Sequence, residues 1–245
     1  DQPLRPYQTI EELKTRTKTV FEQVDPQFGQ YFQTMMDEGL LDLEARKNKA
    51  PGAYSLGYEA IRRPFIFMSH IGTHGDVETL LHEGGHAFHS FESAGVQYFY
   101  QRAENYVPAE FAEVASMGME LLGSAYLTKD KGGFYTAAEA ARARIEHLEG
   151  IITFFPYMAL VDAFQHWIFE NPKDGANALK CEQHWAELWD RYMDGIDYSG
   201  LEDTKKIYWH RQLHIHTFPF YYVEYGLAQL GAVQVWANSL ENQKS

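Results

Sequence analysis

His82 and His86 are the two histidines of a His-Glu-x-x-His pattern, in which Glu83 follows the first histidine and Gly84 and Gly85 fill the gap. Residues four apart lie one above the other on one face of a helix, so both imidazoles can reach a single metal ion. The glutamate lies beside that face, within reach of a metal-bound water. These residue types at this spacing predict a zinc site with Glu83 as general base, an arrangement that hydrolyses peptide bonds.

The motif is expected to lie on a helix. Asp76 is a candidate N-cap, and apolar residues such as Val77 and Leu80 recur at helical spacing after it. Gly84 and Gly85 each cost a helix about 1 kcal/mol relative to alanine. Glycines in such positions often mark a place where another group approaches closely. The alternative is a surface helix that carries two histidines by chance.

A catalytic zinc needs a third protein ligand, which must come from another segment. The stretch after Pro108 is expected to be helical to about Tyr126, and it offers Glu110, Glu113 and Glu120. Glu113 and Glu120 are seven residues apart and share a helix face. Spacing alone does not choose among the three, because a single glutamate is more often a solvated surface charge than a ligand.

The rest of the sequence predicts a mainly α-helical chain with a small sheet before the motif. Helical patterns with capping signals cover roughly residues 9–21, 25–39, 136–170, 176–193 and 220–238. Pro156 is expected to bend or split one of them, and residues 195–203 to form a loop. Short strands are expected at 53–58 and 64–70. Their open edge would suit an extended peptide, and a hairpin that only braces the fold is the alternative.

Composition excludes several classes of protein. The net charge of −13, from 34 acidic against 21 basic side chains, argues against nucleic acid and anionic membranes as partners. The single Cys181 excludes an intrachain disulfide framework and favours a reducing compartment, so a cytoplasmic location is expected. The longest apolar run, residues 151–161, is too short to span a bilayer. Without repeats or low-complexity linkers, residues 1–245 are expected to form one catalytic domain.

Three separated segments carry a family likeness, namely residues 82–89, residues 111–117 and residues 214–226, with Gly72-Thr73 and Asp76-Val77 leading into the first. Together they resemble the M3 family of zinc oligopeptidases, in particular its oligoendopeptidase F and Pz-peptidase branch. The likeness covers essentially the whole chain, which makes it far more specific than the first motif alone. It implies a zincin-like helical metallopeptidase domain with a small β-sheet next to the active-site helix.

The resemblance implies that His82, His86 and Glu113 bind one zinc ion and that Glu83 is the general base and later the proton donor. Zinc would lower the pKa of its bound water to about 7, and Glu83 would remove the proton as the water attacks the scissile carbonyl. The implied activity is that of a metalloendopeptidase, a hydrolase that cuts internal bonds of short oligopeptides.

The resemblance also implies roles for His214, Tyr222 and Tyr225, which match the family's groups that bind substrate and stabilise the tetrahedral intermediate. The neighbouring Tyr221 is expected to point elsewhere. The alternative is that these tyrosines form one aromatic helix face. Glu120 is expected to accept the other ring proton of a ligand histidine.

Two other functions stay open. One is a zinc exopeptidase of carboxypeptidase type on the same framework, and the other is a zinc-bearing, inactive fragment that binds peptides. Typical members of the family are longer and have an N-terminal helical region that helps enclose the cleft. We therefore expect a missing N-terminal half or a homo-oligomer beside the short peptide substrates, and a naturally minimal form is the alternative. The chain begins at Asp1 rather than Met, so its true N-terminus is expected to be missing.

Overall fold

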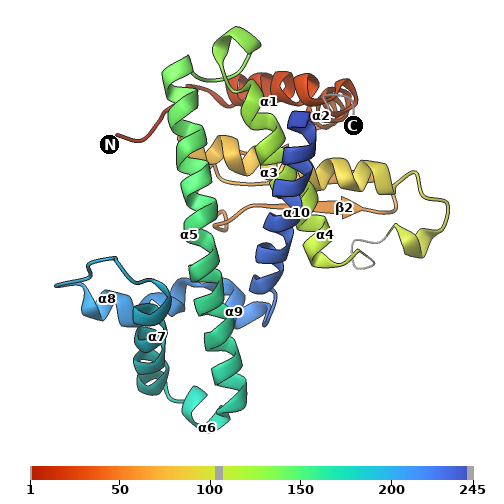
Figure 1. Ribbon diagram of the computed structural model, residues 1–245. Coiled ribbons are helices and arrows are strands. Elements are labelled where there is room, and N and C mark those ends of the chain that lie inside the picture. The colour runs from red at the N-terminus through yellow and green to blue at the C-terminus, as the bar shows by residue number, and fades with distance from the viewer. Residues whose placement is uncertain (1, 103–106, 242–245) are drawn as a thin grey trace. The chain divides into compact units, whose positions relative to one another are not determined.

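The computed structural model describes residues 2–102 and 107–241, most of which are helical (Figure 1). The helices are α1 Ile10–Val24, α2 Pro26–Asp37, α3 His74–Ser93, α4 Ala109–Gly123, α5 Ala137–Glu170, α6 Pro172–Gly175, α7 Ala178–Tyr192, α8 Glu202–Ile207, α9 Leu213–Thr217 and α10 Tyr222–Glu241. The strands are β1 Leu41–Asp42, β2 Tyr54–Tyr58 and β3 Arg63–Phe67. The prediction of a mainly α fold with a small sheet is confirmed. Among the described helices, none combines the length and the apolar composition that crossing a membrane requires.

The sequence did not predict the strand β1, and three of its further predictions about elements differ from the structure. The helix α3 begins at His74 after Thr73, so Asp76 is not its N-cap; its carboxylate instead accepts the backbone N–H of Thr73 at 2.8 Å. The helix α5 continues through Pro156, which does not split it. The predicted loop at 195–203 ends earlier than expected, because α8 begins at Glu202.

The chain divides into two compact units, and each is described by itself. Residues 1–147 and 228–245 belong to the first unit, and residues 148–227 belong to the second. The long helices α5 and α10 therefore contribute residues to both.

In the first unit, α3 packs against α4 and against the strands β2 and β3 (Figure 1). The sheet has the order β1-β3-β2, with β1 parallel and β2 antiparallel to β3. The core beneath it is built from the apolar faces of α1, α2 and α3, whose fully buried side chains include Leu13, Val20, Phe21, Phe32, Met35, Val77 and Leu80. The sheet and α4 thus hold α3 from two directions.

The two glycines of the motif allow these close contacts. A Cβ atom at Gly84 would overlap the end of the Phe21 ring, which belongs to α1. A Cβ atom at Gly85 would overlap the carbonyl oxygen of Ala115 and lie 2.6 Å from the Cα atom of Ser116 on α4. Only hydrogen fits at both positions, and the expectation of a close approach at these glycines is confirmed.

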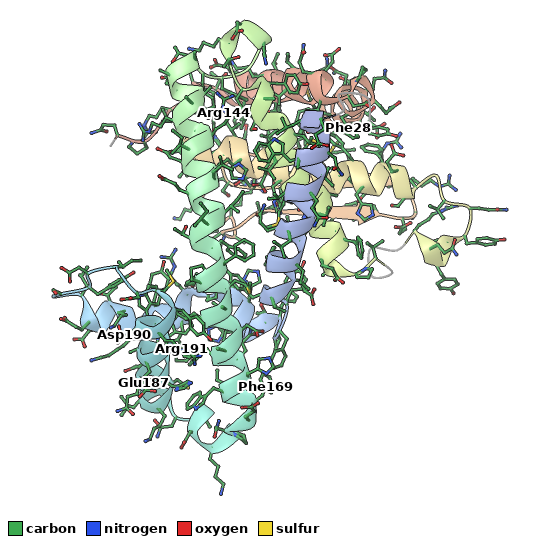
Figure 2. All side chains as sticks on the ribbon, viewed as in Figure 1. Phe28, Arg144, Phe169, Glu187, Asp190 and Arg191 are labelled. Atoms are coloured by element: carbon green, nitrogen blue, oxygen red, sulfur yellow. The ribbon has the colours of Figure 1, made fainter. Side chains whose placement is uncertain are left out.

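The second unit has its own aromatic core. On α7 the charged Glu187, Asp190 and Arg191 are exposed to solvent (Figure 2), whereas Trp185 and Trp189 are buried. These indole rings pack with residues from α5, α9 and α10, including Leu160, Val161, Phe164, Ile215 and Tyr222. The unit is therefore held together by a single apolar cluster from four helices.

Candidate metal centre

The helix α3 presents the two motif histidines one turn apart. The ring centroids of His82 and His86 are 5.0 Å apart, with the ring planes at 83°. Glu83 between them is buried, and its Oε2 atom has no hydrogen-bond partner among the residues that the structure describes. Burial raises the pKa of Glu83 above its usual range. The helix therefore offers two ring nitrogens beside a carboxylate with increased affinity for a proton.

The helix α4 brings a third ligand to this pair. Oε2 of Glu113 lies 3.3 Å from Nε2 of His82 and 3.3 Å from Nε2 of His86. These atoms lie within 4.8 Å of one another, a spacing that can surround one metal ion. The hydroxyl group of Ser116 donates to the same Glu113 oxygen at 2.9 Å and helps to orient it. Glu110 does not belong to this group.

Glu120 lies two helical turns after Glu113 on α4 and contacts the other side of the His82 ring. Its Oε1 atom lies 2.6 Å from Nδ1 of His82, while its Oε2 atom lies 3.0 Å from Nε2 of His147 on α5. A carboxylate at Nδ1 keeps the ring proton on that nitrogen. The lone pair of neutral His82 is then on Nε2, the atom that faces Glu113.

The cluster attracts positive charge. Burial disfavours a charged His82, but the hydrogen bonds to Glu113 and Glu120 outweigh it and raise the pKa of His82 to about 10. Burial also acts against the charge of both carboxylates, yet the histidines around them hold the pKa of Glu113 and that of Glu120 below the usual range. The buried Glu113 and the largely buried Glu120 thus require a cation among them, which is either a proton on the imidazoles or a metal ion.

A pocket of about 340 Å³ opens beside the cluster and is lined by Ala53, Glu78, Thr79, His82, Glu83 and Glu120. Glu83 and the ligand His82 thus share one solvent-connected space. Ala53 directly precedes β2, so the sheet reaches the rim of the same pocket. The arrangement leaves room for a small group to meet the metal cluster and the Glu83 carboxylate together.

His214, Tyr222 and Tyr225 come together in the second unit. Nε2 of His214 lies 3.3 Å from the hydroxyl of Tyr225, and the Tyr222 ring lies 5.1 Å from the His214 ring and 5.6 Å from the Tyr225 ring. The Tyr157 hydroxyl donates to Oε1 of Gln212 at 2.9 Å, and Nε2 of Gln212 lies 2.8 Å from Nδ1 of His214. Because the amide nitrogen is a donor, neutral His214 carries its proton on Nε2.

The expectation that Tyr221 points elsewhere is wrong. Its ring stacks on His214 at 6.2 Å and meets Tyr225 edge-on at 5.3 Å. The backbone N–H of Tyr221 donates to the carbonyl of Phe218 in the turn before α10. The roles of this cluster and of the metal cluster, read from the sequence, stay predictions.

Sequence reasoning missed His147, Gln212 and Tyr157. None of them lies in a spaced motif. Tyr157 and His147 act across long sequence separations, such as the 55 residues between Tyr157 and Gln212, whereas Gln212 lies only two residues before His214. Packing of the helices brings Tyr157 and His147 to the predicted site, and Gln212 is a local neighbour that no motif singled out. Glu120 was expected to contact a ligand histidine, and the structure places it there.

A helical fold in which two histidines and a glutamate form one cluster beside a pocket is typical of a metallopeptidase. The profile of peptidase family M3 matches residues 11–245, and the chain belongs to this family. The family resemblance seen in the sequence is thereby confirmed.

Solved structures and curated sequences agree with this assignment. The structure of Pz peptidase A with an inhibitor matches with a TM-score of 0.87 and 35% sequence identity, over 99% of this chain and 42% of that chain. An oligoendopeptidase F homologue from Mycoplasma genitalium is 30% identical over 148 residues, 59% of this chain and 24% of the relative. A homologue from Mycoplasma pneumoniae is 30% identical over 116 residues, 46% of this chain and 18% of the relative. The chain thus spans less than half the length of these relatives.

Proposed function

We propose that this chain is the catalytic part of a zinc metalloendopeptidase that hydrolyses internal bonds of short oligopeptides. The observation that carries the proposal is the group of His82, His86 and Glu113, whose ligand atoms lie within 4.8 Å of one another beside the buried Glu83. Two imidazole nitrogens and one carboxylate are a donor set of catalytic zinc sites, which use three protein ligands.

The residues present fit a zinc ion. Glu120 keeps the proton of His82 on Nδ1, which leaves Nε2 as the donor atom. The buried Oε2 of Glu83 has no partner among the described residues, as expected for a group whose partner is supplied by a ligand or water. A zinc ion held by this set supplies Lewis-acid polarisation of oxygen atoms in the pocket.

Glu83 performs the proton transfers in this proposal. Its carboxylate accepts a proton from the attacking water and passes it to the nitrogen of the departing amine. Burial supports both steps, because a raised pKa strengthens the base and makes the protonated form available as an acid. Glu83 also lines the pocket where both reactants must meet.

The strand β2 supports binding of an extended peptide. It lies at one end of the sheet order, and along it Tyr54, Leu56 and Tyr58 are exposed to solvent. In the described part of the chain no strand pairs with the second edge of β2. A peptide added there as a further strand would enter the metal pocket at Ala53. This favours the substrate-binding interpretation of the sheet over a purely bracing hairpin.

We assign His214, Tyr222 and Tyr225 to substrate binding and to stabilisation of the oxyanion. The assignment rests on the family resemblance. It is supported by the hydrogen-bonded contact of His214 with Tyr225, since imidazole N–H and phenol O–H groups are suitable donors to a developing negative charge.

The proposed partners are short peptides, alone or with further polypeptide or a second copy of the chain that encloses the site. The charge of −13 disfavours nucleic acid and anionic membrane surfaces. The single Cys181 is a free, buried thiol, which supports a reducing location such as the cytoplasm.

A peptide that is acetylated at its N-terminus and amidated at its C-terminus tests this function. The zinc-loaded protein is incubated with it, and the products are identified by mass spectrometry. We expect cleavage at an internal bond that a chelator abolishes. Release of single residues only from the unblocked version of the peptide would show an exopeptidase, and binding without cleavage of either version would show a peptide-binding protein. Either result would overturn the proposal.

A further inference from the structure

His147 contacts the metal cluster through a single intermediate side chain. The carboxylate of Glu120 joins two imidazoles, with Oε1 at 2.6 Å from Nδ1 of His82 and Oε2 at 3.0 Å from Nε2 of His147. The exposed fractions of these side chains are 17% for Glu120, 23% for His82 and 15% for His147. The three groups therefore form a largely dehydrated chain of polar contacts from α3 through α4 to α5.

The second contact restricts how Glu120 can move. A carboxylate held at one oxygen can still rotate about its last side-chain bond, but one held at both oxygens from different helices cannot. The donors come from α3 and α5, whereas Glu120 itself lies on α4. The orientation of Glu120 decides whether Nδ1 of His82 keeps its acceptor, and hence whether Nε2 stays available toward Glu113.

Removal of the imidazole of His147 leaves Oε2 of Glu120 without this donor in a largely buried place. Such an atom loses a hydrogen bond in a poorly hydrated place unless it turns to another donor or to water. Either movement lengthens or misaligns the bond from Glu120 to His82. Loss of His147 should therefore weaken binding of the metal ion, although His147 is not one of the three ligands.

We propose that His147 is a positioning residue of the metal centre, which clamps Glu120 so that His82 presents Nε2 to the zinc ion. The inference rests on the proposed zinc site and adds a residue to which the sequence motifs give no role.

His147→Leu and His147→Gln form the matched pair for the test. Leucine fills similar space without a donor, whereas the side-chain nitrogen of glutamine extends about as far as Nε2 of histidine and can donate to Glu120. His184→Leu is the control, because His184 pairs with Glu187 at 3.2 Å outside the metal cluster. Zinc dissociation constants are measured by competition with a chromogenic chelator, and the cobalt-substituted proteins give visible spectra that report ligand geometry.

We expect His147→Leu to weaken zinc binding about 10-fold, the lower end of the range for partners that act through a ligand, and to shift the cobalt spectrum. His147→Gln and His184→Leu should stay close to the wild-type protein. Wild-type affinity in His147→Leu, or equal losses in the leucine and glutamine variants, would overturn the proposal.

The variant Glu120→Gln separates this role from a general packing effect. If His147 acts through Glu120, the double variant with His147→Leu and Glu120→Gln should lose less zinc affinity than the sum of the losses in the two single variants. Additive losses would show that His147 acts independently and would contradict the clamp. Because no peptide enters these measurements, they distinguish failure of the clamp from failure of the proposed peptidase activity, which peptide cleavage reports separately.

Discussion

Glu83 is the residue on which the proposed proton transfers depend. The substitution Glu83→Gln keeps the size of the side chain and removes its ability to accept a proton. We expect the variant to fold and to retain zinc, and to lose hydrolysis by about 10²–10⁴-fold. Steady-state kinetics on an internally quenched peptide, with the zinc content of the same samples, checks this. A variant that keeps more than about a tenth of the wild-type rate would place the base elsewhere.

The tyrosine cluster offers a second test at the scale of single residues. Tyr225→Phe removes the hydroxyl that lies 3.3 Å from Nε2 of His214, and Tyr222→Phe removes a buried hydroxyl beside it. If one of them donates to the oxyanion, kcat should fall about 10–10³-fold while KM changes little. Tyr221 contacts the same rings and is not a neutral control, so Tyr198→Phe takes that place. Small, equal effects at positions 222, 225 and 198 would show that the tyrosines serve aromatic packing and not the reaction.

Which single residues can be predicted from the sequence depends on how local their chemistry is. His82, Glu83 and His86 are readable because helical spacing alone places them together. Spacing left Glu113 open among three glutamates, and it was the family resemblance that singled it out. His147 and Tyr157 could not be predicted, since their partners, Glu120 and Gln212, become apparent only when the helices are packed. Gln212 lies two residues before His214, but no spacing rule gives it a role.

The contact between α3 and α4 determines the site at the scale of elements. Gly85→Ala would force a methyl group into the backbone of α4 at Ala115 and Ser116. Since Glu113 lies on the same turn of α4, we expect a loss of about 1–3 kcal/mol of stability together with weaker zinc binding. Thermal unfolding and zinc titration measure the two effects.

Gly118→Ala on the same helix is the matched control for this prediction. A Cβ atom at Gly118 meets nothing within 4 Å among the described residues. Alanine there should be neutral or should stabilise α4 by up to about 1 kcal/mol, with zinc binding unchanged. If both glycine variants behave alike, the close approach of α4 at Gly85 does not control the site.

Asp42 links β1 to the following segment and predicts a dependence of stability on pH. Its hydrogen bonds with Arg46, and then those with Lys49, lower its pKa from the usual 3.8 to about 2. Proton binding therefore favours the unfolded chain, so the contribution of Asp42 is present above about pH 4 and is lost as the pH falls toward 2. We expect Asp42 to contribute about 1 kcal/mol or less to the free energy of unfolding, because the side chains of Asp42 and Arg46 are partly solvated.

Urea unfolding of the wild-type protein and of Asp42→Asn at pH 6 and pH 3 measures this contribution. The difference in unfolding free energy between the two proteins should be largest at pH 6 and should shrink at pH 3. A difference that is the same at both values would show that the carboxylate charge does not stabilise β1.

Element boundaries followed local signals where those signals were strong. The capping pair of Thr136 and Glu139 stands at the start of α5 as predicted, with the Glu139 carboxylate accepting the backbone N–H of Thr136 at 2.9 Å. Pro156 was a weaker guide, because a long helix tolerates one missing N–H when the turns on both sides continue. The short helices α8 and α9 have no sustained apolar period. The helix α9 contributes the buried Ile215 to the aromatic core, whereas α8 packs against α7.

At the scale of the whole molecule, the family assignment covers residues 11–245, whereas the matched region is 42% of the Pz peptidase A chain. The metal cluster lies within residues 82–147, all in the first compact unit. Zinc binding should therefore depend on that unit, and the peptide assay should be run on the full chain with its assembly state recorded. The overall class was predictable because helical periods and three motifs agree, whereas the division into two units has no linker signal in the sequence.

The most direct test of the central claim is the zinc content of the purified protein and of two glutamate variants. After dialysis against a weak chelator, mass spectrometry of the metal content should find one zinc ion per chain in the wild-type protein and in Glu110→Ala. Glu113→Ala should retain far less, because it removes the oxygen that lies 3.3 Å from both motif histidines. A wild-type chain without zinc, or full zinc retention in Glu113→Ala, would contradict the account.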